Sequence, residues 1–447
     1  MSELSLTLEE PRGDEGRVAK AAPVRPQSSV SVATGLVGAA AVSLMVLLLA
    51  TLDLSLEAKI FACFAAAALP MMLWSILVEK VHLRPSTGLA AVRQRDYAAS
   101  LRNAGTKLLG LAVTFGLIAV FYWSFRFYAS GDQAMYFGFL QEALPYLFLI
   151  ALPYLFAVDL YMVEPEDGLW HMGRAVMGRW GEVDGAKLRD HFRAWTIKAF
   201  FLAFLAPIVA GSVANATGLF TNHPFDTVVS TVIWLVQVMF FYDVIFGTIG
   251  YILTFRPLDS HIRSANPHLA AWVAALSCYP PFILMGTGGP LDYRMNTQEW
   301  MVWFQGHDAV LLAWGSGLVL LTAVYAWATV IFGMRFSNLT HRGILTNGPY
   351  RFFKHPAYVS KNLFWWGVHM PFIAVTTSLD AWQNVLLILV TNLVYYLRAK
   401  TEERHLRADP VYRQYEAWIA QNGIVAPITG PLDRALSRLF GLGPRQV

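Results

Sequence analysis

The sequence predicts an all-α protein that crosses a membrane about ten times and keeps both termini in the cytoplasm. Three observations lead to this polytopic helical fold. Of the 447 residues, 56% are hydrophobic and only 14% are charged, whereas a soluble domain carries roughly 25% charged residues. Apolar runs recur along the chain, and the loops between them alternate between basic and nearly uncharged. A surface that faces lipid needs no charge, so this composition indicates a membrane protein.

The apolar runs set the positions of the expected helices. Each run is about 20 residues long, which is enough for a helix to cross roughly 30 Å of hydrocarbon. Backbone groups in lipid must bond within their own segment, so we expect the runs to be helical. They lie near residues 30–52, 59–79, 106–129, 136–162, 195–214, 227–254, 268–286, 308–334, 360–379 and 382–399.

Basic residues distinguish two kinds of loop. Every second loop, and the segment that follows the last run, is rich in Lys and Arg, whereas the alternate loops carry few. The basic set includes Lys80, Arg84, Arg93, Arg174, Lys187, Arg256, Arg263, Arg335, Arg351, Lys354, Arg404 and Arg407. Because basic loops stay in the cytoplasm, the alternation predicts that both termini are inside.

The termini and the cysteines exclude several classes of protein. We expect residues 1–28 to be a disordered tail, because they are polar and mixed in charge. Glu9 and Glu10 make this tail unlike a secretory signal, so the first apolar run should remain as a span. The net charge of +4, without a long basic run, argues against nucleic-acid binding. Cys63 and Cys278 lie in apolar runs and offer no metal or disulfide framework.

A few polar or helix-breaking residues lie within the spans. Pro145 and Pro153 each remove a backbone hydrogen bond and should kink the fourth span, either for packing or for function. Asp159 is close enough to the end of that span to reach the interface. Asp243 lies deepest, and a charge at that depth usually faces a protein interior or a wet cavity.

Two predicted cytoplasmic segments flank the last helical hairpin. In the first, Gly348 and Pro349 mark a turn. Pro356 suits the first position of a helix, where its missing N–H costs nothing. The free N–H groups of such a helix end can bind a carboxylate, and His355 and Tyr358 lie beside them as hydrogen-bond donors.

The second segment closes the last span. On a helix, Arg398, Glu402 and His405 fall on one face, at spacings of four and three. A fixed glutamate can bind the ammonium of S-adenosylmethionine, and an arginine can bind its carboxylate. By spacing alone, the more frequent outcome is a solvated salt bridge at the membrane edge. The two segments bracket a tight hairpin, so we expect them to meet.

Together, the two segments carry a family resemblance. The motifs are Gly348-Pro349-Tyr350 with Lys354-His355-Pro356-Ala357-Tyr358, then Glu402-Glu403, then Tyr412 and Tyr415. This pattern resembles the isoprenylcysteine carboxyl methyltransferase family, which has an Arg-His-Pro-x-Tyr motif followed by a Glu-Glu motif, over about residues 308–425. The related phospholipid N-methyltransferases share the second motif. Lys354 replaces the family's usual Arg, which keeps the charge but loses the bidentate fork.

The resemblance implies an S-adenosylmethionine pocket at the cytoplasmic face and a lipophilic acceptor that enters from the bilayer. The cofactor-binding residues that it implies are Tyr350, His355, Pro356, Tyr358, Arg398, Glu402, Glu403 and His405. The acceptor's entrance would be lined by Asn362, Trp365, Trp366 and His369. For the two tryptophans, an aromatic belt at the interface is the simpler interpretation.

The catalytic roles depend on the acceptor. Methyl transfer requires alignment and exclusion of water, and no catalytic triad. Arg398 or Arg351 would position a carboxylate acceptor. An amine or thiol acceptor would need a base, for which His355 and His405 are the nearest candidates.

The resemblance also divides the chain, and two alternatives stay open. It gives a transmembrane region of unknown role at 29–265, a methyltransferase domain at 266–430 and a tail at 431–447.

Membrane sterol reductases have a similar C-terminal helical arrangement but bind NADPH, which needs more basic contacts. The N-terminal spans could instead form a lipid-binding or transport module without enzymatic activity. The methyltransferase hypothesis requires the turn with His355 to lie against the helix end with Glu402.

Overall fold

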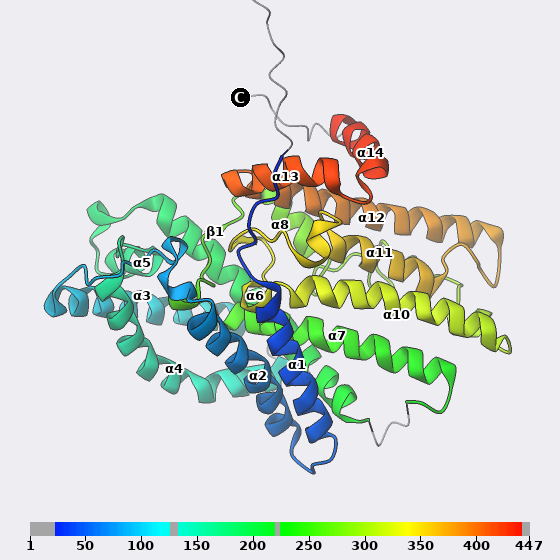
Figure 1. The fold of residues 1–447 in the computed structure, drawn as a ribbon, viewed down its shortest axis with the longest axis horizontal. Helices are drawn as coiled ribbons and strands as arrows, with labels where there is room; N and C mark the ends of the chain where they lie inside the picture. The colour runs from blue at the N-terminus through cyan, green and yellow to red at the C-terminus, as the bar shows by residue number, and fades with distance from the viewer. Residues whose placement is uncertain (1–22, 126–132, 220–223, 440–447) are drawn as a thin grey trace, which may run out of the picture.

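The computed structural model describes residues 23–125, 133–219 and 224–439, and helices make up most of it (Figure 1). The helices are α1 (Val32–Leu49), α2 (Leu56–Leu73), α3 (Tyr97–Ser124), α4 (Gln133–Tyr161), α5 (Gly168–Val176), α6 (Gly185–Thr217), α7 (Val228–Ile252), α8 (Leu269–Leu276), α9 (Trp300–Trp303), α10 (Asp308–Val330), α11 (Pro356–His369), α12 (Ser378–Leu406), α13 (Pro410–Asn422) and α14 (Ala426–Leu439). Two short strands, β1 (Ser264–Ala265) and β2 (Thr340–His341), pair antiparallel. The all-α prediction is confirmed.

Seven helices are long and apolar enough to cross a membrane. They are α1, α2 with its continuation to Val78, α3, α4, α6, α7 and α10. They match the first six predicted runs and the run at 308–334, and they fit an integral membrane protein. The total of about ten spans and the cytoplasmic position of both termini stay predictions.

The predicted span at 268–286 is wrong. Its helix, α8, has eight residues, which rise about 12 Å and fall short of the roughly 30 Å of a bilayer core. Turns follow, because Pro280 and Pro281 have no N–H with which to continue a helix. The segment is apolar because it packs inside the protein, where Cys278 and Met285 join a cluster with Ile388 of α12.

The last two predicted spans form a hairpin of unequal helices. α11 has 14 residues and α12 has 29, and neither is among the seven apolar helices. Within α12, the polar residues Asn384 and Thr391 are fully buried. This face of α12 therefore packs against protein, and the hydropathy of the helix is too low for a simple lipid-facing span.

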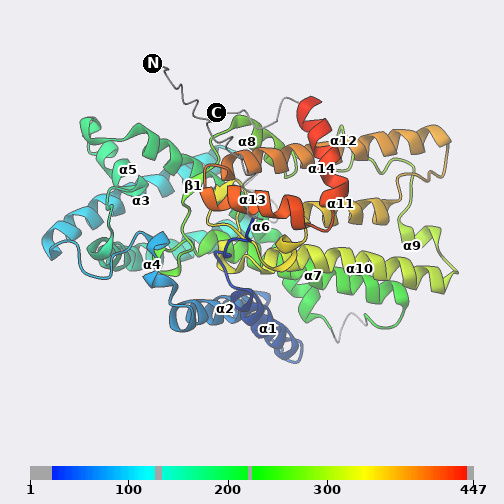
Figure 2. The same cartoon turned by 45° about the horizontal axis from the view of Figure 1, so that its top comes forward.

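The long helices form two groups. α7, α10, α11 and α12 lie side by side in one stack, and α10 packs between α7 and α11 (Figures 1 and 2). α3, α4 and α5 lie at the opposite end of the molecule. α6 connects the groups, since it packs against α7 as well as α4 and α5. The α1–α2 hairpin packs against α6 and α7 through an apolar cluster that includes Val42, Met71, Phe201 and Phe246.

A buried ion pair fixes α3 against α4. Lys107 Nζ lies 2.9 Å from Asp159 Oδ1, and both side chains are at most 1% exposed. The prediction that Asp159 reaches the interface is therefore wrong. A charge buried in this way is tolerated because it is paired, and α3 provides the partner.

The segment before α1 lies against the loop that leads to α11. The amide of Ser29 donates to the carbonyl of Ile344 at 2.9 Å, and Thr346 Oγ1 donates to the carbonyl of Pro26 at 2.8 Å. In contrast to the predicted tail, residues 24–30 thus run along this loop. The first 22 residues of that tail, and the end of the predicted C-terminal tail after residue 439, lie outside the described residues.

Candidate active site

Loops at one end of the helix stack enclose a cavity of about 130 Å³. Its walls come from the segment after α10, the start of α11, the end of α12 and part of α13. It is lined by Tyr350, His355, Tyr358, Arg398 and Glu402, all of which were predicted to bind the cofactor. The two sequence motifs, which the α11–α12 hairpin separates, therefore meet around one cavity.

The first motif shapes one wall through its turn and the start of α11. Gly348 has a φ of +55°, which favours glycine, and a Cβ there would lie 2.5 Å from Cγ1 of Ile331. Pro356 is the first residue of α11, as predicted. His355 precedes it, and its ring stacks on Tyr358 with centroids 5.5 Å apart.

Glu402, near the end of α12, brings a negative charge to the cavity. Its carboxylate accepts a hydrogen bond from the hydroxyl of Tyr358 at 3.0 Å. Among the described residues, no basic side chain lies within ion-pair distance of Glu402. Its remaining lone pairs are therefore available to a cationic or hydrogen-bond-donating ligand group.

Glu403, the next residue, does not line the cavity and lies in a cluster of bases. Its carboxylate is 3.0 Å from His355 Nε2, 2.8 Å from Lys400 Nζ, and 3.4 Å from both Lys354 and Arg407. Burial acts to raise the pKa of Glu403, but the hydrogen bond from His355 and the neighbouring positive charges hold it well below its ordinary range. Glu403 is therefore ionised, and it holds His355 in position.

Arg398 lies one helical turn before Glu402 and is 5% exposed. Its guanidinium donates to the hydroxyl of Tyr279 at 3.1 Å and to Asn338 Oδ1 at 2.5 Å. It also lies 5.1 Å from the ring centroid of Tyr358. No described carboxylate is within ion-pair distance, so this buried cation has only neutral partners. An anionic group of a ligand would compensate its charge.

His405 lies outside the cavity, although the sequence predicted it there. Its Nε2 is 2.9 Å from Ser264 Oγ of β1, and its ring is 6.5 Å from that of His341 of β2. Burial, together with the neighbouring His341 and His268, lowers the pKa of His405 to about 4. The α12 face that was expected to hold Arg398, Glu402 and His405 together is thus divided between the cavity and the β1–β2 ladder.

The predicted acceptor entrance lies behind the cavity wall. None of its four residues, Asn362, Trp365, Trp366 and His369, lines the cavity itself. Asn362 Nδ2 donates to the carbonyl of Tyr358 at 2.7 Å. Trp365 packs edge-on against Tyr395, which does line the cavity, with centroids 5.5 Å apart. The role of these four residues stays a prediction.

The sequence that forms most of this site matches a known family. Residues 306–414 match the phospholipid methyltransferase family. The match covers 109 of the 447 residues and includes both the His355 and the Glu402 motifs, so the resemblance predicted for the C-terminal quarter is confirmed. The narrower likeness to isoprenylcysteine carboxyl methyltransferases stays a prediction. No curated protein and no solved structure matched the chain.

A residue outside the family-matched segment also contributes to the site. Asp243 of α7 accepts hydrogen bonds from Tyr325 Oη at 2.6 Å and Thr329 Oγ1 at 2.5 Å, and both donors line the cavity. Asp243 was unusual in the sequence because it lies deep within a predicted span, but the sequence did not reveal its partners. Within the matched segment, Lys361 also lines the cavity, without a described carboxylate partner, and no motif signalled it.

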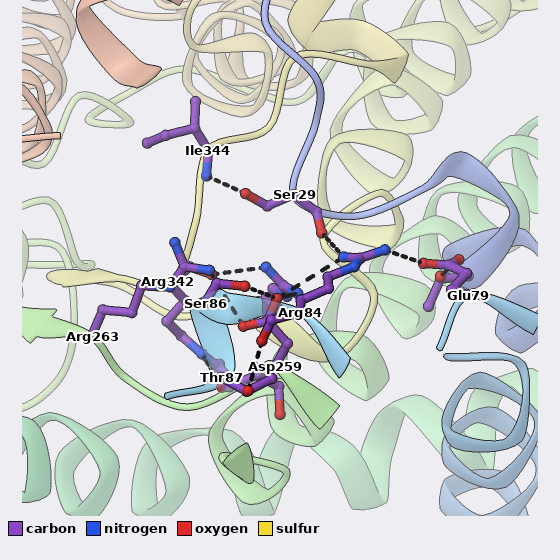
Figure 3. Close-up of polar contacts among 12 residues, drawn as sticks. Ser29, Glu79, Arg84, Ser86, Thr87, Asp259, Arg263, Arg342 and Ile344 are labelled. Carbon is purple, nitrogen blue, oxygen red and sulfur yellow. Dashed lines mark hydrogen bonds and ion pairs between the residues drawn. The ribbon is translucent and has the colours of Figure 1, made fainter. Parts of the chain in front are cut away.

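Asp259 connects the loops that support the family-matched segment (Figure 3). Its buried carboxylate is 2.7 Å from Arg335 and 3.4 Å from Arg263, and it accepts a hydrogen bond from Ser86 at 2.7 Å. Arg84 extends the network, since it donates to the carbonyl of Ser29 at 2.9 Å. Loops from the N-terminal spans therefore brace the cavity from behind, which the sequence motifs did not reveal.

Proposed function

We propose that the protein is an integral membrane methyltransferase that uses S-adenosylmethionine and acts on a lipophilic acceptor at the cytoplasmic face. One observation carries the proposal. Within one cavity of the family-matched segment, Glu402 is an anion and Arg398 a cation, and neither has an ion pair in the described part of the chain. They lie one turn apart on α12, so both charges can bind one zwitterionic ligand.

The groups around the cavity suit the parts of this cofactor. Glu402 would hold its ammonium and Arg398 its carboxylate, each through charge-assisted hydrogen bonds. Tyr350 and Tyr412 offer ring faces for its adenine. When bound, the cofactor supplies a methyl group on a positively charged sulfur, which makes the methyl carbon electrophilic.

His355 is held in a defined orientation for proton transfer. Because Glu403 is ionised, His355 Nε2 donates to it, and Nδ1 is the ring nitrogen left to accept a hydrogen bond. Nδ1 can take the proton of an amine or thiol acceptor. A carboxylate acceptor needs no base, and Arg398 would position it. His355 and Arg398 are therefore the proposed catalytic residues, and the acceptor would approach past Asn362, Trp365, Trp366 and His369.

A reductase that binds NADPH is the alternative with an observation in its favour. Five basic residues line the cavity: Arg335, Arg342, Lys354, Lys361 and Arg398. Arg335 and Lys354 are paired with carboxylates, and Arg342 donates to backbone carbonyls. Only two cations remain for the phosphates of a dinucleotide, and the family match favours methyl transfer.

Titration of the purified full-length protein with S-adenosylmethionine tests the proposal. Glu402→Gln removes the charge that would hold the ammonium and should weaken binding at least tenfold, because hydrogen bonds to charged groups contribute about 1.5–3 kcal/mol. Glu57→Gln, the same change at an exposed position of α2, is the matched control. Equal affinity in the two variants would contradict the proposal, and saturable binding of NADPH alone would favour the reductase.

A further inference from the structure

A second, larger cavity lies in the other half of the molecule, which the family match does not cover. It has a volume of about 800 Å³, within the range of ligand sites, and we call it the α4–α6 chamber. Its walls come from α4, α6, the Lys107 region of α3 and the loop at 254–263. That loop leads into β1, whose partner strand β2 begins with Thr340 of the active-site cavity. The β1–β2 ladder thus lies between the two cavities.

The two long walls of the chamber differ in polarity. α6 presents Lys187, Asp190, Ala194 and Lys198, at spacings of three and four that place them on one helix face. α4 presents Tyr154, Leu155 and Val158, which are mainly apolar, and Met162 follows its last residue. Both helices are among the seven apolar spans. The chamber therefore offers a polar wall and an apolar wall between two helices that are long and apolar enough to span a membrane.

Three of the charged residues that line the chamber are ion-paired within the protein. Lys107 lies 2.9 Å from Asp159 and 3.7 Å from Asp167, and Arg263 is paired with Asp259. Asp190 has no ion pair among the described residues, and its carboxylate accepts a hydrogen bond from the backbone amide of Ala265. The remaining acidic residues, Glu164 and Glu166, and the basic residue Lys187 are exposed at the rim and can be solvated.

Two cations are left without a counterion. Lys198 Nζ donates to Thr254 Oγ1 at 2.9 Å and lies 4.3 Å from the ring centroid of Trp195. Arg256 Nη1 donates to the carbonyl of Thr87 at 3.0 Å. Among the described residues, no carboxylate is within ion-pair distance of either cation. Lys198 lies within α6, one of the apolar spans, and Arg256 lies in the loop just after α7. A cation at such a position that has only neutral partners is costly, and an anion from outside the protein would offset that cost.

We propose that the α4–α6 chamber binds an anionic amphiphile, with its anionic group near Lys198 and Arg256 and its apolar chain along α4. Thr254 links the two cations, because its hydroxyl contacts Lys198 and it precedes Arg256 by two residues. Leu155 and Val158 supply the apolar contacts for the chain. A free small anion would leave this wall and most of the volume unused. The site is independent of the proposed methyl transfer.

Native mass spectrometry of the full-length protein in a nonionic detergent tests the proposal. The probe is dihexanoyl phosphatidylglycerol, with dihexanoyl phosphatidylcholine as the zwitterionic comparison and inorganic phosphate as the anion without a chain. We expect saturable binding of phosphatidylglycerol that Lys198→Met and Arg256→Met each weaken about tenfold or more. Arg189→Met, which removes an exposed charge from the same helix, should leave this affinity unchanged.

Val158→Trp provides a second test that keeps both cations. The larger side chain would occupy the apolar wall, so it should abolish lipid binding even if a cation variant fails to fold. Phosphatidylglycerol binding that equals that of phosphatidylcholine in the unchanged protein would overturn the proposal. It would also be overturned if inorganic phosphate bound as tightly as the lipid, or if Lys198→Met and Arg189→Met behaved alike.

Discussion

The active-site cavity and the α4–α6 chamber differ in size and in how their charges are balanced. The active-site cavity, about 130 Å³, presents an anion, Glu402, and a cation, Arg398, neither of which has an ion pair among the described residues. In the chamber, about 800 Å³, the cations Lys198 and Arg256 lie away from the exposed rim and have no ion pair in the described part of the chain. On the proposals made above, the first site would select a zwitterionic ligand through fixed contacts. The second would accept an anion whose attached chain can vary in shape.

A buried carboxylate lies next to the lining of each cavity, and the two carboxylates differ in their partners. Glu403 behind the active site has four basic neighbours, whereas Asp159 beside the chamber has Lys107 and the amide of Asn103, at 3.2 Å. Both carboxylates are at most 1% exposed. Loss of the carboxylate charge should therefore be more damaging at Glu403, where more positive charge would remain unbalanced.

The largest expected effect is that of Glu403→Gln. It leaves Lys354, Lys400 and Arg407 around a neutral amide, and we expect the free energy of unfolding to fall by about 4 kcal/mol or more. Denaturant unfolding followed by circular dichroism measures this change. Glu182→Gln is the control, because that carboxylate is 46% exposed and its ion pairs should contribute less than about 1 kcal/mol. A loss of under about 1 kcal/mol for Glu403→Gln would show that the cluster is not structural.

Breaking the Lys107–Asp159 ion pair should lower the free energy of unfolding somewhat less than Glu403→Gln does. Lys107→Met leaves Asp159 buried with a single amide donor, and we expect a loss of about 3 kcal/mol in the same unfolding measurement. The double variant Lys107→Met with Asp159→Leu replaces both charges by apolar groups and should recover at least half of that loss. If the double variant were as unstable as the single one, the ion pair would not explain the stability of this region.

A smaller effect is expected from pH at the β1–β2 ladder, between the two cavities. The pKa of His405 is about 4 in the folded protein, below the ordinary value of about 6.5, and burial lowers the pKa of His341 in the same direction. Between these values the unfolded chain binds a proton that the folded protein does not. Stability should therefore fall as the pH drops from about 6.5 toward 4.

A melting series between pH 7.5 and 5 measures this dependence. His405→Gln should reduce the loss of stability by on the order of 1 kcal/mol, discounted because the ring is only partly buried. His307→Gln, at an exposed site before α10, should keep the wild-type pH dependence. An unchanged slope in the His405 variant would mean that the ladder does not titrate in this range.

Local patterns in the sequence predicted most of the helices, but not where apolar segments cease to be helical. Seven apolar runs became long helices, because length and hydropathy decide this outcome locally. The run at 268–286 was misjudged, since Pro280 and Pro281 break the helix while the surrounding protein still buries the segment. Composition does not distinguish burial in lipid from burial in protein.

The site was predictable to the extent that its residues lie in short motifs. The two motifs do meet, with Tyr358 donating to Glu402. The sequence did not distinguish Glu402 from Glu403, because the bases around Glu403 come from both sides of the α11–α12 hairpin. The partners of Asp243 were equally hidden, since Tyr325 lies 82 residues away along the chain. Long-range partners of this kind are fixed by packing rather than by local spacing.

The smallest expected effect concerns the one departure from the family motif, at Lys354. Its side chain lines the cavity, and its ammonium lies 2.9 Å from Glu416 and 3.4 Å from Glu403, so it bridges two carboxylates that do not line the cavity. Lys354→Arg keeps the charge and adds a fork that can reach both carboxylates, and we expect a change in unfolding free energy within about 0.5 kcal/mol. Affinity for S-adenosylmethionine should change less than about threefold.

Lys354→Met is the informative comparison for this position. It removes the bridge and should cost about 1–2 kcal/mol of stability, while affinity for S-adenosylmethionine falls little because Arg398 and Glu402 are untouched. A tenfold loss of affinity in Lys354→Met without a matching loss of stability would place its ammonium on the ligand. The basic residues around Glu403 would then belong to the binding site. They would no longer be comparable with the Lys107–Asp159 pair of α3 and α4, whose role is structural.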